Sequence, residues 1–89
     1  MSILKVSVGQ LKAARMLVGW SQETLASASG ISLPTIKRLE AAEGLIGGRD
    51  TTAQKIRTAL EKAGIEFIDE NGGGPGVRLR KRHRPKKAK

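Results

Sequence analysis

The chain has 89 residues, a formal net charge of +9 and no cysteine, and His83 is its single histidine. A chain of this length forms one small domain, and this composition excludes disulfides and gives no support to a metal site or to histidine-based catalysis. No apolar run approaches the roughly 20 residues that span a bilayer, and the segment 1–5 does not have the pattern of a secretory signal. We therefore expect a cytoplasmic, nucleoid-associated protein that is not an enzyme and holds no metal or cofactor.

The positive charge is concentrated at the C-terminal end. Residues 78–89 contain eight Lys or Arg and no acid, whereas residues 1–77 contain nine basic and eight acidic side chains. Residues 81–89 cannot bury enough apolar surface to offset the entropy of ordering, so we expect a disordered basic tail. Such tails bind nucleic acid phosphates or serve as solvated termini, and composition alone leaves both open. The candidate phosphate contacts in this region are Arg80, Lys81, Arg82 and Arg84.

Hydrophobic periodicity predicts four helices before residue 64. The expected helices cover 8–18, the segment from Ser21 to Gly30, 33–42 and 52–63. The expected N-cap residues of the first three are Ser7, Ser21 and Ser32, since a serine hydroxyl accepts a hydrogen bond from an otherwise unpaired backbone N–H. The sequence Thr51-Thr52-Ala53-Gln54 fits a capping box for the fourth helix, and Trp20 and Leu25 have the spacing of a hydrophobic staple.

The pattern changes after Gly64. Ile65-Glu66-Phe67-Ile68 is typical of a short strand, residues 71–76 have the composition of a turn, and Val77-Arg78-Leu79-Arg80 alternates apolar and basic residues as a half-buried strand does. A two-stranded hairpin is marginal alone and must pack on something. We therefore expect Phe67 and Leu79 to be buried, either in a dimer contact or against the fourth helix.

Residues 21–41 hold the most informative pattern, two helices separated by a short turn that contains glycine. Ala26 is small where the helices cross, Gly30 allows the turn, and Ile36 and Leu39 anchor the second helix on the core. This is the pattern of a helix-turn-helix, whose second helix enters the DNA major groove.

The sequence resembles the phage-repressor-like, or XRE, family of helix-turn-helix regulators. The matching residues are Trp20-Ser21-Gln22-Glu23, Leu25-Ala26, Gly30-Ile31-Ser32, Thr35-Ile36 and Leu39-Glu40. The resemblance covers roughly residues 8–64 and implies a mostly α, four-helix, lambda-repressor-like domain. We divide the chain into a DNA-binding domain (1–64), a β-hairpin (65–80) in place of the family's usual fifth helix, and the basic tail (81–89).

The resemblance also implies roles for individual residues. Gln22 matches a glutamine that contacts phosphate, and Thr35 and Lys37 lie beside the DNA backbone. The positions that face base edges are Ser32, Leu33, Pro34 and Arg38. Arg15 and Glu40 match a structural pair that joins the first and third helices, and Trp20 is expected to be a staple and core residue.

The sequence departs from the family at Leu33-Pro34, where many relatives carry polar residues. Leucine and proline can touch only apolar features such as a thymine methyl, so base-specific hydrogen bonding falls to Arg38 and to Lys37. A solvated helix face is the alternative interpretation of these two cations.

The favoured function is sequence-specific binding of double-stranded DNA as a transcriptional regulator. Regulators of this kind usually bind as homodimers, and the hairpin, with exposed edges, is a candidate dimer element by strand pairing. Two alternatives remain open: an antitoxin with a toxin as protein partner, and an RNA- or ribosome-associated basic protein.

Overall fold

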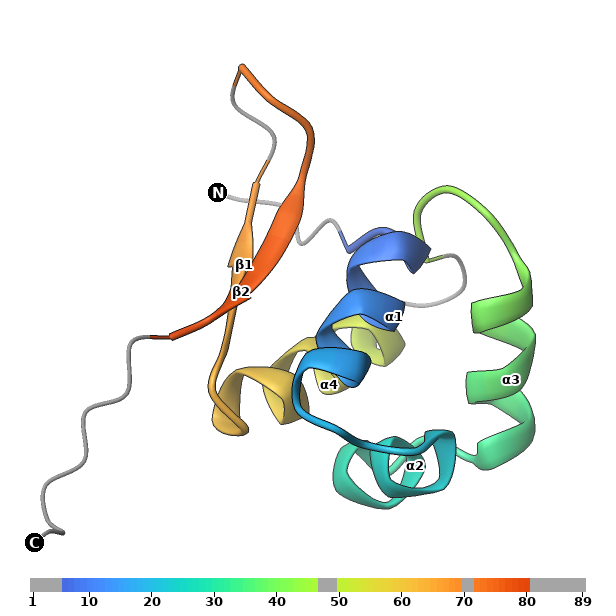
Figure 1. The fold of residues 1–89 in the computed structure, drawn as a ribbon. Helices are drawn as coiled ribbons and strands as arrows, with labels where there is room; N and C mark the ends of the chain where they lie inside the picture. The colour runs from blue at the N-terminus through green and yellow to red at the C-terminus, as the bar shows by residue number, and fades with distance from the viewer. Residues whose placement is uncertain (1–5, 47–49, 70–71, 81–89) are drawn as a thin grey trace, which may run out of the picture.

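The computed structural model describes residues 6–46, 50–69 and 72–80. These residues form four helices and a hairpin (Figure 1). The helices are α1 (Val8–Leu17), α2 (Gln22–Ser29), α3 (Leu33–Ala41) and α4 (Asp50–Lys62), and the strands are β1 (Ile65–Ile68) and β2 (Gly76–Leu79). The expected fold class, a mostly α helix-turn-helix domain with a C-terminal β-hairpin, is confirmed. The tail 81–89 lies outside the described residues.

Serine hydroxyls begin the first three helices as the sequence predicts. Ser7, Ser21 and Ser32 each have extended backbone and accept a hydrogen bond from the backbone N–H three residues later. At α1 the cap is a full capping box, because the Gln10 side chain also accepts a bond from the Ser7 N–H at 2.9 Å. The start of each helix is therefore fixed by local sequence.

The start of α4 differs from the expectation. The helix begins at Asp50, so Thr51 already lies inside it and is not an N-cap, and the predicted capping box is wrong. A threonine in the first turn and a capping threonine have the same spacing to a following glutamine, so the sequence pattern does not distinguish them.

The helices and the hairpin share one hydrophobic core. Its buried members are Val6, Leu11, Ala14, Leu25, Ile36, Leu39, Ile56, Leu60, Ile65 and Phe67. The hairpin contributes Ile65 and Phe67, and the Arg57 guanidinium lies over the Phe67 ring at 5.0 Å from its centroid. The hairpin thus packs against the helices within one chain, which meets the need of so small a sheet for a partner.

The two strands pair antiparallel with Ile65 opposite Leu79 and Phe67 opposite Val77. β2 begins and ends one residue earlier than expected. Leu79 is 48% exposed although it lies on the same face as buried Ile65. The expectation that Leu79 is buried therefore fails for the single chain, because the helices do not cover that end of β2.

Gln10 joins α1 to the hairpin. Its side-chain Nε2 donates to the carbonyl oxygen of Ile68 at 3.3 Å and to that of Gly76 at 2.9 Å, one from each strand. The residue is buried, and its oxygen is occupied by the capping box at Ser7. One amide therefore connects the first turn of α1 with both strands.

Candidate nucleic-acid interface

The α2–turn–α3 unit is held by backbone geometry and one buried hydroxyl. Gly30 ends α2 with a φ of 76°, a conformation that L side chains rarely adopt, and its N–H bonds to the Ala26 carbonyl at 2.9 Å. Ser29 Oγ accepts from the Ile31 N–H and donates to Ala26. These contacts turn the chain within three residues and set the direction of α3.

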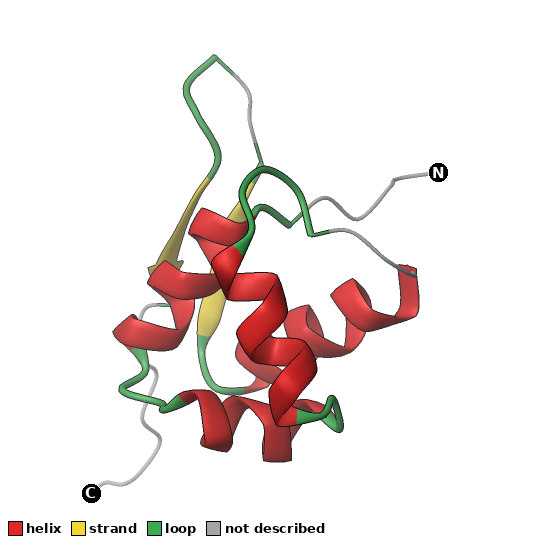
Figure 2. Cartoon of the chain, turned by 90° about the vertical axis from the view of Figure 1, so that its right-hand side faces the viewer, coloured by secondary structure: helices red, strands yellow, loops and turns green. Residues whose placement is uncertain are grey.

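One face of α3 is in the core and the other is open. Ile36, Leu39 and Glu40 are buried, at the helical spacing of one face. Pro34, Lys37 and Arg38 are exposed on the opposite side, and Leu33 and Thr35 are half-buried between the two faces. Figure 2 looks at this side of the molecule, with α3 in front and the hairpin behind. The open face of α3 and the hairpin are therefore on opposite sides of the domain.

The hydroxyls at the start of α3 are already partly used. Ser32 Oγ accepts from the Thr35 N–H at 3.3 Å and donates its proton to Thr35 Oγ1 at 2.9 Å. A hydroxyl has a single proton, so Ser32 keeps no donor, whereas the Thr35 hydroxyl still has one to offer. Of the two residues, Thr35 is the better placed to donate to a phosphate oxygen.

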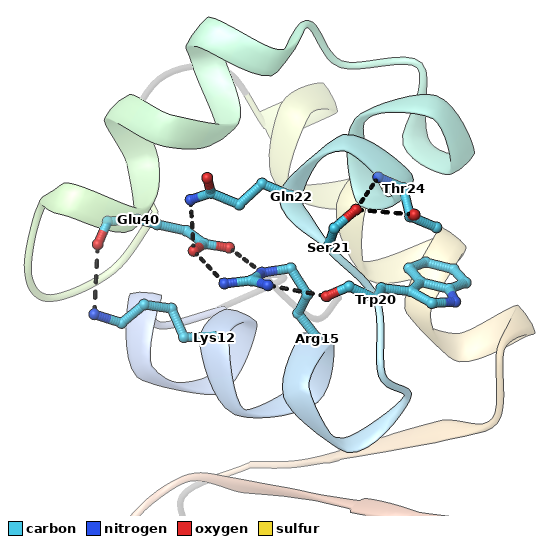
Figure 3. A network of polar contacts seen from close by, with 7 residues as sticks. All are labelled: Lys12, Arg15, Trp20, Ser21, Gln22, Thr24 and Glu40. Carbon is cyan, nitrogen blue, oxygen red and sulfur yellow. Dashed lines mark hydrogen bonds and ion pairs between the residues drawn. The ribbon is translucent and has the colours of Figure 1, made fainter.

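A buried polar network connects α1, α2 and α3 (Figure 3). Arg15 binds the Glu40 carboxylate with two bonds, Nε to Oε2 at 2.7 Å and Nη2 to Oε1 at 2.8 Å. Gln22 Nε2 donates to the same Oε1 at 3.0 Å, and Arg15 Nη1 donates to the Trp20 carbonyl at 2.9 Å. The ion pair expected between the first and third helices is thus present, and it also holds the side chain of Gln22.

The network keeps the Glu40 carboxylate ionised. Burial by itself raises the pKa of Glu40, but the hydrogen bonds from Arg15 and Gln22 and the charges of Arg15 and Lys12 outweigh it and hold that pKa below its ordinary value. The hydrogen bond to Glu40 in turn raises the pKa of Arg15. Both groups are charged at neutral pH, so the pair attracts at full strength.

The sequence reasoning missed Lys12. Its Nζ donates to the Glu40 backbone carbonyl at 3.4 Å, where a cation stabilises the end of α3. No local signal marks this contact, since the two residues are far apart in the chain. Gln10 was missed as well, although the spacing Ser7-x-x-Gln10 is itself a capping-box signal.

In the described structure Arg80 is bonded to the body of the domain and is not part of a free tail. Its N–H bonds to the Gly64 carbonyl at 2.7 Å, and its Nη2 donates to the carbonyls of Glu61 at 2.9 Å and Ile65 at 3.4 Å. The guanidinium therefore caps the C-terminal end of α4, away from α3. Lys81, Arg82 and Arg84, the other predicted contacts of this region, lie outside the described residues.

This fold and this arrangement of charges define a helix-turn-helix protein. The sequence profile of the helix-turn-helix family matches residues 11–64, and the chain belongs to that family, as an XRE-like member among DNA-binding regulators. No significant match was found among curated proteins. In the ranges that the structure describes, no helix is long and apolar enough to cross a membrane.

Proposed function

We propose that the protein binds double-stranded DNA sequence-specifically and regulates transcription, with α3 in the major groove. The observation that carries the proposal is the open face of α3, which presents Lys37 and Arg38 while its acid, Glu40, is buried and paired. Among the described residues, neither cation forms an ion pair. An α-helix fits the major groove, and arginine bound to guanine O6 and N7 is the commonest base-specific contact.

The residues around Arg38 divide into two groups in this proposal. Leu33 and Pro34 contact apolar features such as thymine methyl groups, and Ser32 orients the start of the helix. Thr35, Lys37 and Gln22 approach the phosphates, which fix the position of the protein without carrying sequence information. Gln22 suits this role because Glu40 holds one of its amide hydrogens, which leaves the second hydrogen for a phosphate oxygen.

The regulator acts as a homodimer in this proposal. Two copies of α3 then read two half-sites about 34–36 Å apart, one turn of the double helix. Occupancy of such a site at a promoter blocks polymerase, which makes a cytoplasmic, nucleoid-associated repressor the simplest form of the regulator. The tail 81–89 adds phosphate attraction that is independent of sequence.

Selection from a library of random duplexes tests the proposal. We expect one enriched sequence, and Arg38→Ala should weaken binding to it by about 1–3 kcal/mol and relax the preference at one base position. Lys55→Ala is the matched control, because Lys55 is exposed on α4 and lies outside α3. An absence of enrichment, or an equal loss on selected and random duplexes, would contradict base reading by Arg38.

Structured RNA belongs in the same assay as a competitor. Tighter binding to RNA than to the selected duplex would replace the DNA proposal by the RNA-associated alternative.

A further inference from the structure

Among the described residues, no backbone group pairs with the outer edge of β2. In the antiparallel ladder the Arg80 N–H bonds to the Gly64 carbonyl, so Arg80 and Arg78 direct their backbone groups toward β1. Because this direction alternates along a strand, the N–H and C=O groups of Val77 and Leu79 point away from β1. Within the described part of the chain these outward groups have no hydrogen-bond partner.

The outer edge of β1 is less available than that of β2. Arg80 donates to the Ile65 carbonyl, and α4 packs against β1. Exposed strand edges pair readily with other strands, so the open edge of β2 is a candidate for pairing.

The open strand carries an exposed apolar side chain of its own. Leu79 on β2 is 48% exposed. α1 packs against β2 (Figure 1), with Gln10 bonded to Gly76 at the start of the strand. At the C-terminal end of α1, Met16 and Leu17 are 71% and 45% exposed.

We propose that β2 pairs antiparallel with β2 of a second copy, so that the two hairpins form one continuous four-stranded sheet. A two-fold axis at Arg78 places Val77 of each copy opposite Leu79 of the other, and these are the residues whose backbone groups point outward. An isologous contact of this kind satisfies the same groups on both copies. The inference rests on the proposed function, since it supplies the dimer that reads two half-sites.

The side chains fit this register on both faces of the sheet. On the face that packs against the helices, the side chains that lie side by side across the sheet are Ile65 and Leu79 of one copy and Val77 and Phe67 of the other. Val77 of the second copy therefore covers the exposed Leu79. A two-fold axis perpendicular to the sheet keeps α1 of both copies on this face. The row is continuous and apolar, as a buried sheet face requires.

On the other face the register brings Arg78 opposite its own copy. Like charges opposite each other destabilise a strand pair. Here each guanidinium is already held by Glu66 with bonds of 3.0 and 3.2 Å, so the row alternates from acid to two bases to acid. The ion pairs within each copy therefore reduce the repulsion at the axis.

Phe67 is not part of this contact, although the sequence suggested it. It is 8% exposed and belongs to the core of the single chain. A charge at Phe67 would unfold the domain and give no information on the dimer. Leu79 is the residue to change, because its exposed half is free of the core.

The first test is the dimer dissociation constant of the full chain without DNA, from sedimentation equilibrium. Leu79→Asp should raise that constant roughly 30-fold or more, as expected when a central apolar side chain is replaced by a charge. Leu45→Asp is the matched control, because Leu45 is also exposed (59%) and lies outside β2, in the loop between α3 and α4; it should leave the dissociation constant unchanged. Circular dichroism verifies that both variants are folded. A wild-type chain that stays monomeric at its highest soluble concentration, or a dimer unaffected by Leu79→Asp, would overturn the proposal.

The second test uses the absence of cysteine from the sequence. Residues opposite each other in a non-hydrogen-bonded pair have Cα atoms about 4.5 Å apart, within disulfide range. Arg78→Cys should therefore cross-link almost completely on mild oxidation, whereas Leu45→Cys should not. Equal cross-linking of the two variants would exclude an axis at Arg78. Neither test involves DNA, whereas the DNA-binding proposal is tested by the duplex selection. A failure of the dimer proposal is therefore distinguishable from a failure of the DNA-binding proposal.

Discussion

Removing the charge of Glu40 should destabilise the folded protein strongly. In Glu40→Gln the new amide has one acceptor oxygen in place of the two that now receive Arg15 Nε, Arg15 Nη2 and Gln22 Nε2. The NH₂ group of the new glutamine faces other hydrogen-bond donors. The Arg15 guanidinium loses its counter-ion although the Arg15 side chain is only 15% exposed. An unpaired buried charge is far more costly than a missing neutral hydrogen bond.

The magnitude follows from the burial of the pair. Breaking a fully buried ion pair costs about 3–5 kcal/mol. Arg15 keeps its bond to the Trp20 carbonyl and some contact with water, so we expect about 2–4 kcal/mol for this pair. In a domain of this size that loss lowers the melting temperature by roughly 10–30 °C.

Urea unfolding followed by circular dichroism measures the loss, at one protein concentration because any dimer makes stability concentration-dependent. Glu61→Gln is the matched control, because its partner Arg57 is as covered as Arg15, at 17% exposed, whereas Glu61 itself is 41% exposed and water can replace its lost charge. It should cost less than about 0.5 kcal/mol. The double variant Arg15→Met/Glu40→Gln should lose at least about 1 kcal/mol less free energy of unfolding than the sum of the losses of the two single variants. Equal effects of Glu40→Gln and Glu61→Gln, or no coupling with Arg15→Met, would refute the reasoning.

Four further outcomes are expected. Because the folded pKa of Glu40 lies below its ordinary value of 4.5, its contribution to stability is complete above that pH and is lost as pH falls through the folded pKa; acid titration should therefore affect the wild type more than Glu40→Gln. Gln10→Leu should cost about 1–3 kcal/mol, since the hairpin carbonyls and the Ser7 N–H lose their partner, and hydrogen exchange in β1 and β2 should accelerate. Gly30→Ala should cost about 1–2 kcal/mol at a φ of 76°, measured by thermal melting. Removing residues 81–89 should flatten the log-affinity against log-salt slope, by about 0.9 for each phosphate that the tail neutralises, and leave the ratio of specific to random binding unchanged.

The accuracy of the sequence predictions depended on the range of the interactions involved. Ser21 and Gly30 act on backbone within a few residues, so spacing alone predicted the start and end of α2. The hairpin followed from a change of period and a glycine-rich turn. The Arg15–Glu40 pair came from a resemblance, because nothing in the spacing of two residues 25 positions apart predicts a contact.

The features that were missed depend on tertiary packing. Gln10 has the spacing of a capping residue, which the sequence analysis did not use, and its bonds to Ile68 and Gly76 form only because the hairpin folds back over α1. Arg80 reads as the first residue of a basic tail, yet the end of α4 offers carbonyl oxygens that hold it. Leu79 has the alternation of a buried position, but burial depends on tertiary packing, and among the described residues Leu79 stays 48% exposed.

The position of Trp20 gives the protein an internal optical probe. It is the single tryptophan of a chain that has no tyrosine, so ultraviolet emission comes almost entirely from one indole. That indole packs half-buried against the core, while the carbonyl of the same residue is bound by Arg15. Two residues further on is Gln22, the first residue of α2. The wavelength of tryptophan emission therefore reports the environment of the turn between α1 and α2, and a conformational change there is detectable in unlabelled protein.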